Sequence, residues 1–415
     1  MAFKLIIVFQ MILISIVMAK KTSTPHRHTI KTIQVKDGDT IDCVDIYKQP
    51  AFDHPAMKNH TLQMKSNHLD PMQVTPRTIL RNTSSSSSSS KLPSQVWLQY
   101  GSCPHGTIPI RRPTNHHQTN VRGHPRKVIA TKDHSYAVVL TEGFSYSGAK
   151  ANIKVFNPYV ESVSGSQQNG PLPVGDYSSS QVMLRNGPLQ TFETAEAGWT
   201  VNPIIYNDHK TRLFAYWTVD GMQHTGCFDL TCPGFVQTSS EVLLGGDIGS
   251  YYASEITIQI SKDPYTNNWW FKFNDKEVGY WPGDIFELLK YHAVLVQWGG
   301  EVYSQKVGTH PHTGTEMGSG QFSDPILETS GMMKGILIEE NSNPLKRPET
   351  LFVSADEWVC YDAYLVTEYV PEPVFYYGGP GSRQNPSKPI NGIIATDPCL
   401  LHFNLLQSNP LCNTT

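Results

Sequence analysis

The stretch LFAYWTV at residues 213–219 decides the fold class, because its aromatic and β-branched side chains are typical of a central β-strand. A second stretch, ITIQI at 256–260, alternates apolar and polar residues as a half-buried strand does. A third, WWFKF at 269–273, is followed by an Asn-Asp turn and by VGYW at 278–281, which predicts a hairpin. Short strands separated by turn residues predict an all-β fold, an antiparallel β-sandwich of the jelly-roll or concanavalin-like kind.

The composition fits a folded, β-rich protein and argues against one class of partner. Of the 415 residues, 39% are hydrophobic and 10% aromatic, which suits a sizeable core, and 29 prolines with 31 glycines supply many turns. The formal net charge is -3 and no basic stripe is visible. We therefore expect no nucleic-acid partner.

Residues 1–19 have the pattern of a signal peptide. Lys4 supplies the positive start, residues 5–17 are almost wholly apolar, and Ala19 is a small residue suited to cleavage. The run is too short for a membrane-spanning helix, which needs about 20 residues, and no later segment is long and apolar enough. We expect a soluble, secreted protein, and the glycosylation sequons at Asn59 and Asn82 fit that route.

The segment that follows, residues 20–130, differs in character from residues 131–397. It is largely polar, contains a serine run at 82–90 that is a flexible spacer, and ends in a basic stretch. The cleavage candidates are Arg111-Arg112, Arg122 and Arg126-Lys127. This layout predicts a zymogen, with an activation peptide at 20–130, a large β-sandwich domain at 131–397 and a tail at 398–415. The alternative is a small N-terminal domain joined by an ordinary linker.

The seven cysteines indicate an oxidising compartment. Most should pair there, and an odd number leaves one thiol free or available to another molecule. Cys227 and Cys232 enclose only four residues, so a local disulfide loop is the natural pairing. No C-x-x-C pair is present, which argues against a zinc ribbon.

Two glutamates stand out as candidates for chemistry. Glu196 lies in AEAGW at 195–199 and Glu301 in QWGGEV at 297–302, each on an expected strand beside a tryptophan and glycines. A carboxylate is expensive to desolvate, so an acid in such a place is either paired or functional. On a strand Glu196 shares its face with small neighbours, and Glu301 shares its face with Gln297 unless the glycine pair forms a bulge.

A carboxylate pair on one face of a sandwich supports two kinds of hydrolysis. In glycoside hydrolysis one carboxyl is the acid and the other a nucleophile or base. In peptide hydrolysis one carboxylate deprotonates water while its protonated partner stabilises the oxyanion. The alternative is structural, with each glutamate capping a bulge or pairing with Arg or Lys. Neither chemistry needs a cofactor, and His310-Pro311-His312 lacks the spacing of a zinc site, so we expect no metal.

Several motifs, in order, resemble the neprosin family of plant secreted proteins. The resemblance runs through EAGWTVNP at 196–203, LFAYWT at 213–218, CPGFVQ at 232–237, WGGEV at 298–302 and HTGTEMGSG at 312–320. The parts at 42–55 and 101–112 resemble the activation peptide attached to that domain. The family implies a glutamic endopeptidase, a sandwich of two antiparallel sheets with two catalytic glutamates in its cleft, and a zymogen that matures at acid pH. The characterised member cleaves after proline.

Carried over to this sequence, the resemblance makes Glu196 and Glu301 the catalytic pair. It also implies the disulfide Cys43–Cys103 in the activation peptide, with Cys360 paired to Cys399 or Cys412. The side chains expected along the substrate cleft are Trp199, Trp217, Gln297, Trp298 and Tyr303. The expected partners are a peptide or protein substrate and the chain's own propeptide. The expected state is a monomer in the extracellular space (apoplast), with the vacuole as the other destination.

The sequence supports two further hypotheses. Ten of the sixteen histidines lie at or before His134 and charge as the pH falls through about 6.5, which would loosen an activation peptide in acid. The rival function is that of a non-catalytic, carbohydrate- or cell-wall-binding β-sandwich whose aromatic side chains stack on sugars.

Overall fold

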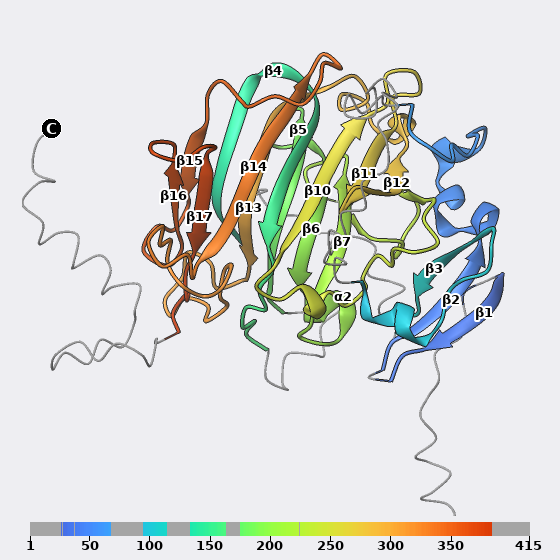
Figure 1. The fold of residues 1–415 in the computed structure, drawn as a ribbon, viewed down its shortest axis with the longest axis horizontal. Coiled ribbons are helices and arrows are strands. Elements are labelled where there is room, and N and C mark those ends of the chain that lie inside the picture. Colours follow the sequence, from blue (N-terminus) through green and yellow to red (C-terminus); the bar gives the residue numbers. More distant parts are fainter. Residues whose placement is uncertain are drawn as a thin grey trace, which may run out of the picture.

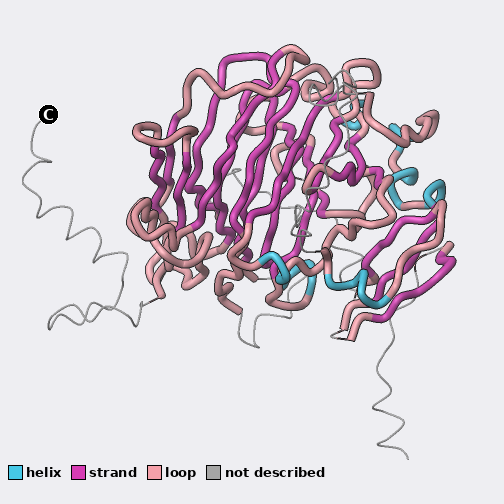
Figure 2. The backbone as a smooth tube through the Cα atoms, viewed as in Figure 1, coloured by secondary structure: helices cyan, strands magenta, loops and turns pink. Residues whose placement is uncertain are grey.

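The computed structural model describes residues 26, 28–36, 38–67, 94–113, 133–162, 175–223 and 225–383. The expected signal peptide, the serine run at 82–90, Asn82, and the tail from 398 with Cys399 and Cys412 all lie outside these residues. Within them the chain is almost entirely β-strand and loop (Figure 2). The all-β, antiparallel expectation is confirmed. No helix of the described ranges is long and apolar enough to cross a membrane.

One layer of the sandwich carries the two candidate glutamates. Its strands, in spatial order, are β8 (Cys227–Phe228), β7 (Thr211–Thr218), β6 (Glu193–Val201), β5 (Tyr177–Asn186), β13 (Ala293–Tyr303), the first half of β4 (His134–Lys154) and β15 (Phe352–Ala355). All of the pairings are antiparallel.

The second layer covers the inner face of the first. Its strands are β9 (Val236–Gln237), β12 (Lys276–Trp281), β11 (Trp269–Phe273), β10 (Glu255–Lys262), the second half of β4, β14 (Gly331–Glu340), β17 (Val374–Gly378) and β16 (Asp362–Val366). The WWFKF–VGYW hairpin predicted from the sequence is β11–β12. In Figure 1 strands β10 and β14 lie in front of β5, β6 and β13.

Strand β4 belongs to both layers. Its residues from His134 to Glu142 pair with β13, and its residues from Gly148 to Lys154 pair with β10. The change occurs at an exposed bend around Gly143, whose φ of 95° is a conformation that glycine adopts readily. A strand that passes from one sheet to the other closes the corner of the sandwich without a separate loop.

The N-terminal segment, defined here as described residues 26–113, forms a small sheet of its own. It contains β1 (Thr29–Gln34), β2 (Thr40–Asp45) and β3 (Thr107–Arg111), which pair antiparallel at one end of the sandwich (Figure 1). The short helical turns within the described residues are η1 (Ile46–Lys48), η2 (Pro50–Asp53), η3 (Pro55–Met57), η5 (Val96–Tyr100), α2 (Pro203–Tyr206), η7 (Gly249–Tyr251) and η8 (Gly283–Ile285).

The N-terminal segment shares the core of the sandwich. Val44, Ile46, Ile108 and Ile110 belong to the same buried cluster as the residues between the two layers. Ala51 and Met57 pack on Trp270 and neighbouring side chains of the second layer. Burial of this apolar surface stabilises the docked segment, and its removal exposes part of the core to water.

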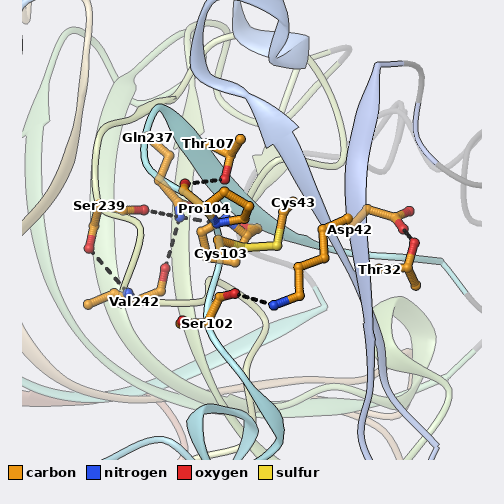
Figure 3. The surroundings of a disulfide bond; sticks show 12 residues. Thr32, Asp42, Cys43, Ser102, Cys103, Pro104, Thr107, Gln237, Ser239 and Val242 are labelled. Carbon is orange, nitrogen blue, oxygen red and sulfur yellow. Dashed lines mark hydrogen bonds between the residues drawn. A yellow bond between two sulfur atoms is a disulfide. The ribbon is translucent and has the colours of Figure 1, made fainter.

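The predicted disulfides are present where the described residues allow a test. Cys43 is bonded to Cys103 and Cys227 to Cys232. Figure 3 shows Cys103 beside Gln237, Ser239 and Val242, so the first disulfide lies where the N-terminal segment meets the sandwich. Cys360 is also disulfide-bonded, to a partner outside the described residues. Asn59 is exposed, as a glycosylation acceptor must be.

Candidate active site

Three neighbouring strands place the two glutamates on one face. Gln181, on β5, is directly opposite Gly198 of β6 and Gly299 of β13. Glu196 precedes Gly198 by two residues and Glu301 follows Gly299 by two, so both project to the same side as Gln181. The register between β13 and its neighbours is unbroken from Leu295 to Tyr303, so the glycine pair forms no bulge and Glu301 keeps the face expected from alternation.

The side chain of Gln181 joins the two carboxyl groups. Its Nε2 donates to Glu301 Oε2 at 2.8 Å and, more weakly, to Glu196 Oε2 at 3.4 Å. Its Oε1 accepts from the Ser179 hydroxyl at 2.6 Å, which fixes the orientation of the amide. Two acids distant in sequence are thereby brought within reach of a single nitrogen atom.

Glu301 lies among donors. Its Oε1 accepts from the Tyr177 hydroxyl at 2.9 Å and from the Tyr136 hydroxyl at 3.3 Å, and lies 2.5 Å from His134 Nδ1. Burial works to raise the pKa of Glu301, but the hydrogen bond and charge of His134, with the donors from Gln181 and Tyr177, lower that pKa overall. Glu301 is therefore suited to the ionised form.

Glu196 lies in the opposite kind of environment. Its Oε1 is buried and has no hydrogen-bond partner within the described part of the chain. Burial, together with the negative charge of Glu301, raises the pKa of Glu196 to about 8. Two carboxyls in contact with the same amide thus have pKa values pushed in opposite directions, which is the pattern of an acid and a base in one site.

A small hollow opens between the two glutamates. It measures about 10 Å³, roughly the space of one water molecule. The side chains around it are Tyr177, Ser179, Glu196, Phe214, Tyr216, Met222, Phe228 and Glu301. Mostly aromatic walls around two acids lower the local polarity and strengthen the interactions between the charged groups.

Three of the expected cleft residues lie elsewhere. Trp199 and Trp298 are fully buried, Trp217 is 5% exposed, and all three belong to the core between the layers. The correction follows from the alternation of side chains between the two faces of a strand. Trp199 and Trp298 each lie three residues from the glutamate on their own strand. Trp217 pairs with Ala195, the residue next to Glu196, so all three tryptophans point away from the face of the glutamates. The other two expected residues, Gln297 and Tyr303, do share the face of Glu301, and Tyr303 stacks on Tyr177.

Four residues that touch Glu301 were not among the candidates from the sequence: His134, Tyr136, Tyr177 and Gln181. One signal was available for Gln181, which is a long polar side chain between three serines and the apolar run Val182-Met183-Leu184. The other three could be found only once the register of β4, β5 and β13 was known.

Buried ion pairs hold the N-terminal segment against the sandwich. The Asp39 carboxylate accepts hydrogen bonds from Arg212 Nη1 at 2.9 Å and Arg212 Nη2 at 3.1 Å, and a third from Arg111 Nε at 2.8 Å. Arg212 is paired with Asp208 as well. Burial works to raise the pKa of Asp39, but the two arginines lower it overall. The contact joins β7 to a residue just before β2.

Two family models match this chain. The model described as neprosin matches residues 174–380, and the model described as neprosin activation peptide matches residues 32–139. The chain belongs to the neprosin family. At the level of the family it is a peptidase zymogen, with Glu196 and Glu301 inside the neprosin match and strands β2 and β3 of the small sheet inside the activation-peptide match.

Among solved structures, one that aligns with this chain is the crystal structure of a β-porphyranase from the human gut bacterium Bacteroides plebeius. The identity is 8%, the alignment covers 40% of this chain and 54% of that chain, and the TM-score is 0.21. The alignment thus spans about half of the length of the porphyranase. A likeness of this size carries no argument about activity or substrate.

Proposed function

We propose that this chain is a secreted glutamic endopeptidase in which Glu301 is the general base and Glu196 the general acid. The observation that carries the proposal is the single amide of Gln181 in contact with both carboxyls, one surrounded by donors and one left with an unpartnered oxygen. An ionised Glu301 beside a protonated Glu196 is the pair that peptide hydrolysis by activated water requires.

The proposed reaction begins with a water molecule in the hollow between the acids. Glu301 Oε2 takes a proton from the water as its oxygen attacks the scissile carbonyl carbon, and the carbonyl oxygen becomes an oxyanion. The proton on Glu196 donates a hydrogen bond to that oxygen and stabilises its charge. The C–N bond then breaks, the leaving nitrogen takes the proton held by Glu301, and both glutamates return to their starting states.

The test is the pair of substitutions Glu196→Gln and Glu301→Gln. Each keeps the size of the side chain and removes its acid chemistry, so each should lower kcat on peptides by several orders of magnitude while the folded protein persists. Circular dichroism and thermal unfolding check the fold. Full activity in either variant would remove the assignment. A proteome-derived peptide digest at several pH values, read by mass spectrometry, reports whether cleavage follows proline.

Activation in acid forms the second part of the proposal. Burial lowers the pKa values of His26, His54 and His60, all in the N-terminal segment. A histidine whose pKa is lowered by docking binds protons more readily when undocked, so acid below about pH 6.5 favours release. Asp39 behaves differently, because its pKa is lowered. Its carboxyl group therefore stays ionised until the pH falls below the range in which carboxyl groups ordinarily titrate. As the pH falls, we therefore expect protonation of the histidines to weaken docking of the N-terminal segment first, and protonation of Asp39 to weaken it at lower pH.

A carbohydrate-binding role would use exposed aromatic side chains on one face. Trp199, Trp217 and Trp298, the tryptophans nearest to the two acids in sequence, are core residues and offer no such surface. Polysaccharide hydrolysis and binding assays run beside the peptide assay separate the two functions.

A further inference from the structure

His134 touches the candidate base from the very start of the large domain. It is the first residue of β4, is directly opposite Tyr303, and its Nδ1 lies 2.5 Å from Glu301 Oε1. Its ring stacks on Tyr136 and meets the edges of Tyr177 and Tyr303, with the Tyr303 centroid 5.0 Å away. The imidazole is therefore held by aromatic packing and is not free to rotate away from the carboxylate.

The two carboxylate oxygens of Glu301 have different contacts. Oε1 is surrounded by His134, Tyr136 and Tyr177, all of which present a hydrogen-bond donor. Because a carboxylate oxygen only accepts, Nδ1 of His134 carries a proton in this contact. Oε2 meets Gln181 and faces Glu196 across the hollow. Oε2 is thus the oxygen with a lone pair left for water.

From this geometry we infer that His134 is a positioning residue, whose Nδ1–H holds Oε1 of Glu301 in place and leaves Oε2 as the base. The inference rests on the proposed function and deepens it. It identifies Oε2 of Glu301 as the reacting atom and adds His134 to the candidate active site. His134 lies in the activation-peptide match (32–139) and not in the neprosin match (174–380).

Acidic and phenolic side chains surround His134. From β13 it faces Glu301 and Tyr303, from β5 Tyr177, and from its own strand Tyr136. Asp356, which follows β15, accepts from the Tyr136 backbone N–H at 3.1 Å and lies close enough to feel the charge of His134. Glu196 and Tyr216 line the hollow together with Glu301. No arginine or lysine is among these neighbours within the described residues.

The position of His134 also limits where the zymogen can be cut. The Ser304 backbone N–H donates to the Asp133 carbonyl at 2.9 Å, so the pairing of β4 with the end of β13 includes Asp133. Cleavage after His134 would remove the imidazole from the site. The active form must therefore begin at or before Asp133, within the basic stretch that the sequence offers for processing.

The experiment compares His134→Asn and His134→Ala with the wild type. Asn places an N–H donor near the position of Nδ1, and Ala removes the donor. Each variant is processed by a trace of tagged wild-type enzyme, which is then removed. We expect kcat to fall about 10²-fold for Ala and less for Asn, with KM nearly unchanged. The acid limb of the kcat/KM profile should move up by about 1–2 pH units in Ala.

The control is His312→Asn. His312 is another buried histidine paired with a glutamate, Glu357, at 2.9 Å, but it does not contact either candidate catalytic acid. It should lower the unfolding temperature without moving the acid limb. If His134→Ala does not fold, the kinetics of His134→Asn alone test the inference, because Asn retains an N–H donor near the position of Nδ1.

The outcomes separate this inference from the proposed function. Full activity in the Glu→Gln variants overturns both. A wild type that depends on Glu196 and Glu301, with a His134→Ala variant whose pH profile and kcat match it, overturns the inference alone. Mass spectrometry of the processed wild type should give a first residue no later than Asp133, and a fully active form that begins after His134 overturns it too.

Discussion

The Asp39 carboxylate and the Arg212 guanidinium meet across the boundary between the N-terminal segment and the sandwich through two hydrogen bonds, of 2.9 and 3.1 Å. Arg212 is almost fully buried on β7, two strands from Gln181, so the charge that holds the segment belongs to the sheet that carries the candidate site. Docking of the segment and the integrity of this sheet are therefore coupled through one arginine.

Asp39→Asn should loosen the zymogen. The change leaves Asp208 as the one carboxylate paired with Arg212 among the described residues and removes the carboxylate that Arg212 shares with Arg111, so we expect a loss of about 3 kcal/mol in unfolding free energy. Processing at a given acid pH should become faster. Differential scanning calorimetry and a time course by mass spectrometry measure the two effects. Asp53→Asn, an exposed carboxylate of the same segment, is the control, and equal behaviour of the two variants would contradict the prediction.

Gln181→Ala should lower kcat by about 10²-fold, because the substitution removes the one donor shared by the two acids. Loss of that donor raises the pKa of Glu301, so the acid limb of kcat/KM moves to higher pH. A matched control exists on the other layer, where the buried Gln259 contacts Ser261 and Glu339 in a similar arrangement. Gln259→Ala should reduce stability alone, and an equal loss of kcat in both variants would argue against a special role for Gln181.

Glu196→Gln should stabilise the folded protein at neutral pH while abolishing activity. The folded-state pKa of Glu196 is raised to about 8, so the native state holds a proton that the unfolded state releases above about 4.5. Stability therefore falls as the pH rises from about 4.5 to 8, and a permanently neutral amide avoids this loss. We expect a gain on the order of 2 kcal/mol at pH 7 that vanishes near pH 4. Thermal unfolding at both pH values measures it. A variant less stable than the wild type at pH 7 would contradict the raised pKa.

His60→Gln should shift processing to lower pH. His60 meets the Tyr280 hydroxyl at 2.7 Å, burial lowers its pKa, and Gln can keep the hydrogen bond without taking a charge. The docked state then loses one of the groups that penalise it as the pH falls below about 6.5. Time courses between pH 3 and 7 give the midpoint of processing. His105→Gln, at an exposed position, serves as the control and should leave the midpoint in place.

Alternation along each strand was enough to predict the fold class and the face on which each glutamate lies. It did not indicate which of the two faces is the core. Trp199 and Trp298, expected along the cleft, each lie three residues from the glutamate on their own strand, and residues an odd number of positions apart on a strand point to opposite faces, so both are core residues. The site itself depends on pairing between β4, β5 and β13, and the register that brings His134 and Tyr177 to Glu301 involves residues more than a hundred positions apart.

The glycines on both sides of Gln181 set the limits within which this site can be redesigned. A Cβ at Gly198 would meet the Ser180 carbonyl at 1.9 Å, and one at Gly299 would meet the Ala137 carbonyl at 2.4 Å. Any side chain there would push the strands apart and separate the two acids. An engineer who seeks a new cleavage preference must therefore leave β5, β6 and β13 untouched and vary the far wall of the hollow, at Phe214, Met222 and Phe228.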